Sequence, residues 1–264
     1  MHKYLSILFL FNLIGCSEIQ EHSLRRPDHI HPLKKELKEI SGLSFVNPKM
    51  LVAVQDENGF IFRLNFDNFE KGKKIDFGKK GDYEGITNAF DRYYILKSNG
   101  HIISVNLAGK DKIVYKPDFK DKIEFEGLCF DKKNNQLLIL CKNHPSKKKN
   151  KYINVYSFDL SKKEFAKKPF IKVNKKEAGI YNANGLLPSG IAINPIDGYI
   201  YIVSSIGKKL IVLDQDGKYV HYYNLDKTIY IQPEGLSFSE NGELYIASEG
   251  KSGKAQVMHF ISIP

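Results

Sequence analysis

Residues 232–249 read Gln-Pro-Glu-Gly-Leu-Ser-Phe-Ser-Glu-Asn-Gly-Glu-Leu-Tyr-Ile-Ala-Ser-Glu, and this stretch decides the fold. Apolar side chains alternate with other residues before and after an Asn-Gly pair, for example at Leu236 and Phe238 on its N-terminal side. Alternation with a period of two predicts half-buried β-strands, and Asn-Gly is a strong signal for a tight hairpin turn. The stretch therefore predicts a β-hairpin that opens with an acidic residue and a glycine.

The same opening recurs four times upstream, each time at the start of an alternating segment. The glycines of the five openings are Gly42, Gly85, Gly127, Gly190 and Gly235, separated by 43, 42, 63 and 45 residues. Periods of 40–45 residues with four short strands each are typical of a β-propeller. The longest interval contains a lysine-rich loop at 143–151 and a polar segment at 174–187, which together account for its extra length.

The first four repeats each contain four alternating segments, whereas the fifth contains three. An apolar segment at 33–39 precedes the first glycine and has no blade of its own. We expect it to pair beside 255–261, because an open sheet edge is an aggregation liability that a closed propeller removes. The predicted fold is an all-β, five-bladed propeller of four-stranded blades over residues 32–264, closed by an N-terminal strand that joins the last blade.

The first 15 residues carry one lysine and an apolar run that is too short to span a bilayer, as in a signal peptide. The quartet Leu13-Ile14-Gly15-Cys16 resembles the lipobox of bacterial lipoproteins, in which the cysteine is lipidated; an ordinary secretory signal is the alternative. Ser17 resembles an outer-membrane sorting residue. We therefore expect a lipoprotein of the cell envelope, at the outer membrane, held to the lipid through Cys16.

Residues 16–31 are polar and lack an apolar period, which predicts a tether between the anchor and the folded domain. His29 and His31 flank Ile30 within it. Their spacing is one that can hold a metal, although two histidines on a flexible segment are more often solvated.

The chain has a formal net charge of +10, a balance that is found in proteins that bind nucleic acid or anionic lipid. Its lysines are scattered through turns and strand edges, and the dense run is confined to Lys147-Lys148-Lys149. An exported protein rarely meets nucleic acid. We therefore interpret the charge as solvated surface, and we expect a monomer with no nucleic-acid partner.

Two cysteines, Cys129 and Cys141, lie on the two strands of one predicted hairpin. A turn centred on Lys133 and Asn134 places Cys129 opposite Leu138 and points Cys141 to the other face of the sheet. This register favours two buried thiols over a disulfide.

The openings of the repeats are similar to those of the SdiA-regulated family of bacterial propellers, which are distant relatives of NHL repeats. The resemblance covers roughly residues 33–264. It implies a five-bladed, exported propeller and calcium at a site in at least one member, but it supplies no reaction. The phrases that carry it are Glu39-Ile40-Ser41-Gly42-Leu43, Phe125-Glu126-Gly127-Leu128, Pro188-Ser189-Gly190-Ile191, Pro233-Glu234-Gly235-Leu236 and Tyr245-Ile246-Ala247-Ser248-Glu249.

The residues just before the five glycines are expected to form a ring at one mouth of the central channel, because the first strand of each blade lines the axis. Three of the five are glutamates. Three carboxylates about 5 Å apart repel by roughly 3 kcal/mol per pair at an effective dielectric near 20, so they should bind a cation or take up protons. Oxygen ligands select calcium. The ring consists of Ser41, Glu84, Glu126, Ser189 and Glu234.

The predicted metal ligands are Glu84, Glu126 and Glu234. Alternatively, these glutamates cap strand ends, or they form a catalytic carboxylate cluster without metal. Residues that end the second strands should stand beside the same mouth and complete the site directly or through water. These are Asp56, Ser98, Asn143, Ser205 and Glu249, of which Asp56 and Glu249, together with Ser41 and Ser189 of the ring, are the candidates for the outer shell of ligands.

Two classes of function fit these features. The first is a calcium-binding propeller that holds an unidentified small molecule or envelope protein at its mouth. The second is a calcium-dependent hydrolase of esters, lactones or phosphates, in which a metal over the channel polarises the substrate. The repeat places no histidine at the ring to act as a general base, and His101 and His144 reach the mouth only by loop geometry. This favours the first class.

Overall fold

The structure is a computed structural model that describes residues 22–66, 69, 72–180 and 185–263. The predicted signal segment 1–15 and the predicted lipidation site Cys16 lie outside the described residues. In the part of the chain that is described, no helix has the length and apolar character needed to cross a membrane.

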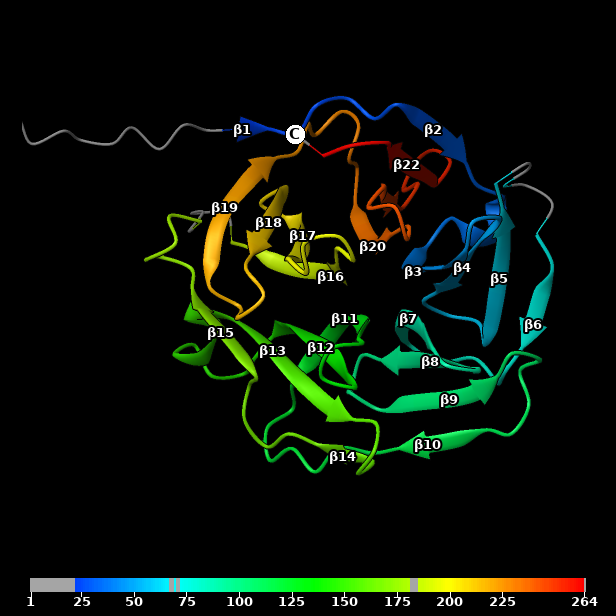
Figure 1. Cartoon of the computed structure of the whole chain (residues 1–264), viewed down its shortest axis with the longest axis horizontal. Helices are drawn as coiled ribbons and strands as arrows, with labels where there is room; N and C mark the ends of the chain where they lie inside the picture. The colour runs from blue at the N-terminus through cyan, green and yellow to red at the C-terminus, as the bar shows by residue number, and fades with distance from the viewer. Residues whose placement is uncertain (1–21, 67–68, 70–71, 181–184, 264) are drawn as a thin grey trace, which may run out of the picture.

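Five antiparallel sheets surround a central axis, which confirms the predicted five-bladed propeller (Figure 1). The innermost strand of every sheet begins at or just before one of the five repeat openings. This agreement follows from the alternating apolar pattern, which gives each strand two faces that pack against neighbouring blades. The innermost strands are β3 (Ile40–Asn47), β7 (Tyr83–Ala89), β11 (Glu124–Asp131), β16 (Leu187–Ile193) and β20 (Pro233–Phe238).

The remaining strands extend each blade outward. The first blade adds β4 (Met50–Gln55), β5 (Phe60–Asn65) and β6 (Lys74–Asp76), and the second adds β8 (Arg92–Lys97), β9 (Ile102–Asn106) and β10 (Ile113–Tyr115). The third adds β12 (Gln136–Asn143) and β13 (Tyr152–Asp159), with β14 (Glu164–Phe165) and β15 (Ile171–Asn174) both paired to β13. The fourth adds β17 (Ile200–Ile206), β18 (Lys209–Leu213), β19 (Tyr219–Asn224) and the parallel strand β1 (His22–Ser23).

The fifth blade consists of β20, β21 (Leu244–Ser248), β22 (Gln256–Phe260) and β2 (His29–Pro32). An N-terminal strand therefore closes the ring, as predicted, but its position differs from the prediction. β2 pairs antiparallel with β22, and His29 lies opposite His259. Strand β1 and all of β2 except Pro32 fall within residues 16–31, the segment predicted as a tether.

The segment 33–39, predicted as the closing strand, instead contains the short 3-10 helix η1 (Lys35–Leu37). Leu33 and Leu37, four residues apart, both point into the core between the fifth and first blades. This spacing suits a turn of helix rather than a strand, whose side chains alternate with a period of two. The expectation for 33–39 was therefore wrong, and the segment links β2 to β3.

The hydrophobic core is divided into five clusters, one between each pair of neighbouring blades. The two cysteines illustrate the arrangement. Cys129 pairs with Leu138 across β11 and β12, as predicted, and it packs toward the fourth blade, whereas Cys141 packs toward the second. Both are buried free thiols, which confirms the favoured interpretation, and burial raises the pKa of Cys141 to about 12.

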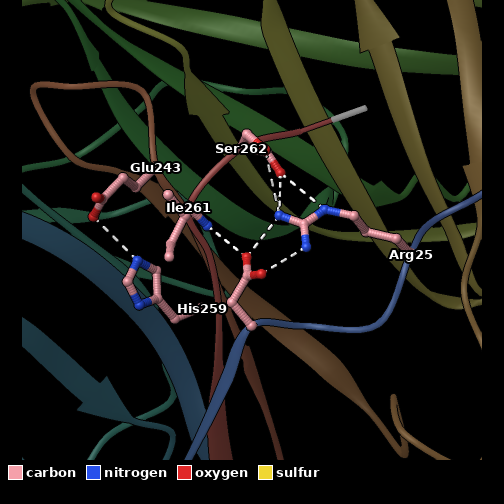
Figure 2. Close-up of polar contacts among 6 residues, drawn as sticks. Arg25, Glu243, His259, Ile261 and Ser262 are labelled. Atoms are coloured by element: carbon pink, nitrogen blue, oxygen red, sulfur yellow. Dashed lines mark hydrogen bonds and ion pairs between the residues drawn. The ribbon is translucent and has the colours of Figure 1, made fainter.

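Polar contacts outside the sheets tie the N-terminal segment to the end of the chain (Figure 2). The Arg25 guanidinium donates to both carboxylate oxygens of Asp28, at 2.8 and 2.6 Å, and to the carbonyl of Ser262 at 2.6 Å. Asp28 in turn accepts a hydrogen bond of 2.8 Å from the backbone N–H of Ile261. These contacts hold β2 in register against β22.

Candidate functional site

The residue before each repeat glycine lies at an irregularity in the strand pairing. In all five blades the register between the first and second strands shifts at this position, for example between Tyr83 and Gly85 and between Phe125 and Gly127. Such bulges re-aim a side chain out of the regular alternation. Five copies of the bulge therefore turn five side chains toward the mouth of the channel.

The glycines are needed because the innermost strands approach one another closely. A Cβ on Gly42 would lie 2.8 Å from the Cα of Gly85, and a Cβ on Gly190 would lie 2.1 Å from the carbonyl oxygen of Glu234. Both distances are shorter than real Cβ atoms tolerate, and the neighbours are backbone atoms that cannot move aside. The glycines thus set how closely the ring residues meet.

The structure brings the five ring residues together around one small hollow on the axis. Its volume is about 10 Å³, close to the least volume that accommodates one water molecule. The hollow is lined by the five ring residues, by the glycines and by the residue after each glycine; the ring residues are Ser41, Glu84, Glu126, Ser189 and Glu234.

The two serines of the ring join neighbouring blades. The Ser41 hydroxyl donates a hydrogen bond of 2.6 Å to the carbonyl of Tyr83, and the Ser189 hydroxyl donates one of 2.7 Å to the carbonyl of Pro233. Each acceptor is the residue immediately before a ring glutamate. The serines therefore hold the backbone that carries Glu84 and Glu234.

The three glutamates are largely withdrawn from solvent, with Glu126 and Glu234 exposed by 7% and 6%. Burial, the charge of Glu126 and a hydrogen bond with Asp82 raise the pKa of Glu84 to about 10. Burial and the charges of Glu126 and Glu249 raise the pKa of Glu234 well above its ordinary value. Glu84 therefore holds a proton at neutral pH, and burial favours the neutral form of Glu234.

Lys142, on β12, is part of this mouth and was not predicted. Its ammonium forms an ion pair with Glu126. Burial lowers the pKa of Lys142, but the charges of Glu126, Glu234 and Glu84 outweigh burial and raise it. Lys142 lies two residues after Leu140, the strand partner of Gly127. This position near the end of the second strand is the feature of the sequence that could have predicted its place at the mouth. The ammonium is an internal counter-charge to the glutamates.

A second acidic group borders the mouth between the fifth and first blades. Burial, Glu39 and Glu57 raise the pKa of Asp56 to about 6, and burial, Asp56 and Glu39 raise the pKa of Glu249 to about 7. The Oδ1 atom of Asp56 is buried without a hydrogen-bond partner in the described structure. The predicted outer-shell carboxylates, Asp56 and Glu249, therefore lie where a nearby positive charge would stabilise their ionised forms.

The other residues that end second strands are engaged elsewhere. The Ser98 hydroxyl contacts the Asp82 carboxylate, the Asn143 carbonyl oxygen accepts a hydrogen bond from Asn150 at 2.7 Å, and the Ser205 hydroxyl lies 3.5 Å from the carbonyl of Leu187. These three residues do not line the hollow. They stabilise the loops around it.

The donor set at the mouth fits calcium in chemistry and in charge. The glutamates offer oxygen ligands, which calcium prefers. Three ionised glutamates and Lys142 would carry a net charge of −2, which one divalent cation balances. Among the described residues, however, no three acidic, histidine or cysteine side chains already surround one point as metal ligands. A bound ion would therefore require the proton on Glu84 to leave and the three carboxylates to move closer together.

A larger pocket of about 870 Å³ is lined in part by Lys142, the ion-pair partner of Glu126 at the mouth. Its walls come from the loop at 143–151, which includes the 3-10 helix η2 (Lys149–Lys151), and from described parts of 174–187. These are the two segments that make the third repeat long. Five lysines and no acidic residue line the described pocket; they are Lys142, Lys147, Lys151, Lys175 and Lys176.

Histidine is absent from the described lining of both the hollow and the pocket. His144, one of the two candidates to approach the mouth, is 1% exposed, and its Nε2 atom lies 3.3 Å from the Asp121 carboxylate. Its Nδ1 atom accepts a hydrogen bond of 3.1 Å from the backbone of Ser146. His144 therefore organises the lysine-rich loop.

Comparison with known proteins gives one family and several propellers of the same fold. The model of the SdiA-regulated family matches residues 22–251. No curated protein matches the chain.

Among solved structures, a glutaminyl cyclase from Myxococcus xanthus is 12% identical and superposes with a TM-score of 0.59 over 90% of this chain and 97% of that one. A gluconolactonase from Xanthomonas campestris is 13% identical, with a TM-score of 0.54 over 81% and 69%. A luciferin-regenerating enzyme is 12% identical, with a TM-score of 0.54 over 89% and 96%. At these identities the likeness establishes a shared fold only.

Proposed function

The chain belongs to the SdiA-regulated family of β-propellers, and we propose that it is a lipid-anchored binding protein of the cell envelope. In this proposal Glu84, Glu126 and Glu234 hold one calcium ion at the mouth of the channel, and the adjoining pocket binds the ligand. The observation that carries it is the meeting of three withdrawn carboxylates and one lysine at a hollow beside a large pocket. Charge of this kind is costly unless a partner balances it.

Each side chain has a distinct part in the proposed site. Burial raises the pKa of Glu126, and the ion pair with Lys142 opposes this effect, so in the proposal Glu126 gives a cation its first oxygen ligand. Glu84 holds a proton that a cation must displace, and a cation must also offset the burial that raises the pKa of Glu234. When bound, the ion supplies positive charge beside the pocket. Glu249 lies close enough to the mouth for the charge of Glu126 to raise its pKa, and Asp56 raises the pKa of the same group.

The pocket beside the mouth favours an anionic ligand. Lys142, Lys147 and Lys151 line one part of it, and Tyr152 adds an aromatic face. Lysine ammonium groups bind carboxylate and phosphate as point charges, and a calcium ion at the mouth would add to the same positive field. We propose an acidic small molecule or an acidic segment of an envelope protein as the occupant.

A calcium-dependent hydrolase is the second candidate, because the proposed ion would lie directly beside the pocket and would polarise a bound ester, lactone or phosphate. The described lining offers no imidazole as a general base, and Glu84 is protonated at neutral pH. This chemistry favours binding without turnover.

Activity assays distinguish the two candidates. The purified protein is incubated with generic esters, lactones and phosphomonoesters, with calcium and with chelator, and we expect no calcium-dependent turnover. Turnover that requires calcium and is lost in Glu126→Gln would show the hydrolase and would overturn the binding function.

We also propose that Cys16 carries the lipid that attaches the protein to the membrane. Replacement of Cys16 by serine is expected to move the protein from the membrane fraction to the soluble fraction without changing the melting temperature of the propeller, because lipid chains are the proposed anchor. Fractionation followed by detection of the protein measures this. Continued membrane association of the serine variant would show that something other than lipid is the anchor.

A further inference from the structure

Three histidines meet on one face of the fifth blade, and none of them is among the described residues that line the axial hollow. His29 lies directly opposite His259 across β2 and β22, and His31 follows His29 by two residues, on the same face of β2. The ring centroids are 5.5 Å apart for His29 and His259, 6.1 Å for His29 and His31, and 6.3 Å for His31 and His259. The fold thus gathers residues that the sequence separates by more than 200 positions.

A carboxylate orients one of these rings. The Nε2 atom of His259 lies 3.1 Å from the Glu243 carboxylate (Figure 2). The same carboxylate also accepts a hydrogen bond of 3.0 Å from the Tyr245 hydroxyl. Tyr245 stacks on the His259 ring at 4.4 Å. An acidic acceptor at Nε2 keeps the proton there and leaves the lone pair of Nδ1 free, which is the support that metal-binding histidines usually receive.

The rings of His29 and His31 are also placed to bind a metal ion. His29 is exposed and His31 is half-buried, so ions from solvent reach both. His31 stacks on Phe69 at 4.1 Å, which limits its rotation.

From these contacts we propose that His29, His31 and His259 form a binding site for Zn²⁺ or a similar divalent transition metal, supported by Glu243. Imidazole nitrogens bind zinc at about 2.1 Å, so two rings at a tetrahedral ion have centroids roughly 5.3 Å apart. The pair His29 and His259 already has this separation. The other two pairs must close by about 1 Å, and among the described residues no set of three yet surrounds one point.

A metal at this site would link the two strands that close the ring, because its ligands lie on both of them. His29 and His31 belong to β2, the N-terminal strand, whereas His259 belongs to β22, the last strand of the described fold. A metal bound by all three would clasp the two strands together. It would therefore stabilise the ring against opening at its closing strand.

Calorimetric titration of the full chain with zinc at pH 7.5, with calcium in excess to occupy the carboxylates, tests the proposal. We expect one zinc per chain. Alanine at His29, His31 or His259 should weaken binding by more than about tenfold, and Glu243→Gln should weaken it by roughly 10–100-fold, as loss of an outer-shell partner does. Alanine at His101, a histidine of the second blade, is the matched control and should leave the affinity unchanged.

The melting temperature provides a second readout. Zinc should raise it in the wild type and in His101→Ala, and should not raise it in His29→Ala, whose exposed side chain can be removed without loss of folding. The absence of zinc binding by the wild type, or unchanged affinity in both His29→Ala and His259→Ala, would overturn the proposal. A Co²⁺ derivative with the absorption of a tetrahedral site would support it.

Discussion

Deletion of the chain through Pro32 is expected to lower the free energy of unfolding by about 3–5 kcal/mol, because it removes the four-residue ladder between β2 and β22 at roughly 0.5–1.5 kcal/mol per hydrogen bond. The deletion also removes the contacts of Arg25 and Asp28 with the end of the chain. For a chain of this size the melting temperature should fall by about 10 °C.

The matched control is deletion through residue 21, which leaves β1 and β2 in place. This shorter deletion should melt as the full chain does. Denaturant unfolding of both proteins measures the difference, and it is expected to lie almost wholly between residues 22 and 32. Equal stability of the two deletions would mean that β2 contributes nothing to closure, and the fifth blade would then have to be stable with an open edge.

The mouth glutamates are expected to make the protein less stable as the pH rises, when calcium is removed by chelator. Glu84 has a raised pKa, about 10 in the fold, against roughly 4.3 in an unfolded chain. Between these values the folded state holds a proton that the unfolded state has lost, so the free energy of unfolding falls with increasing pH. At 1.36 kcal/mol per pKa unit, the loss from pH 4.5 to pH 7 is of the order of 3 kcal/mol.

Glutamine at position 84 should remove this dependence, because it keeps the size and the polar atoms of the protonated glutamate and cannot ionise. In chelator at pH 8, about 3.7 pH units above the unfolded pKa, Glu84→Gln is therefore expected to be more stable than the wild type by about 5 kcal/mol. Glu240→Gln, at the exposed turn of the fifth blade, is the matched control and should match the wild type. Denaturant unfolding from pH 5 to pH 9 measures all three proteins. A wild type with pH-independent stability, or a Glu84→Gln variant less stable at every pH, would contradict the account.

Calcium should reduce this difference in stability in the same experiment. An ion that binds the folded mouth and not the unfolded chain stabilises the wild type by about 2.7 kcal/mol at a hundred times its dissociation constant. The Glu84→Gln variant has lost one ligand and gains less. The wild type is therefore expected to be less stable than the variant in chelator and to recover part of the difference in calcium.

The repeat predicted the fold because one physical requirement recurs in every blade. The innermost strands approach so closely that only glycine fits at Gly42 and Gly190, and the residue before each glycine must then point to the mouth. Such a requirement places a glycine at the same position of every repeat. The positions of Glu84, Glu126 and Glu234 followed from the same pattern.

Features that do not recur in every blade were not predicted. The closing strand β2 is a four-residue edge strand whose exposed residues carry little apolar pattern, whereas Leu33 and Leu37 gave 33–39 the stronger apolar signal. Lys142 occupies the mouth in one blade alone, so no repeat marks it. The meeting of His29 with His259 depends on the pairing of β2 with β22, which becomes evident only once the ring is closed.

Calorimetric titration with calcium tests the central claim, that the carboxylate mouth is a cation site. The account predicts one calcium per wild-type chain, binding weakened by at least about tenfold in glutamine variants of Glu84, Glu126 and Glu234, and tighter binding in Lys142→Gln, which removes the internal counter-charge. No calcium binding by the wild type, or unchanged affinity in all three glutamate variants, would contradict it and would leave Lys142 and protons as the charges that balance the mouth.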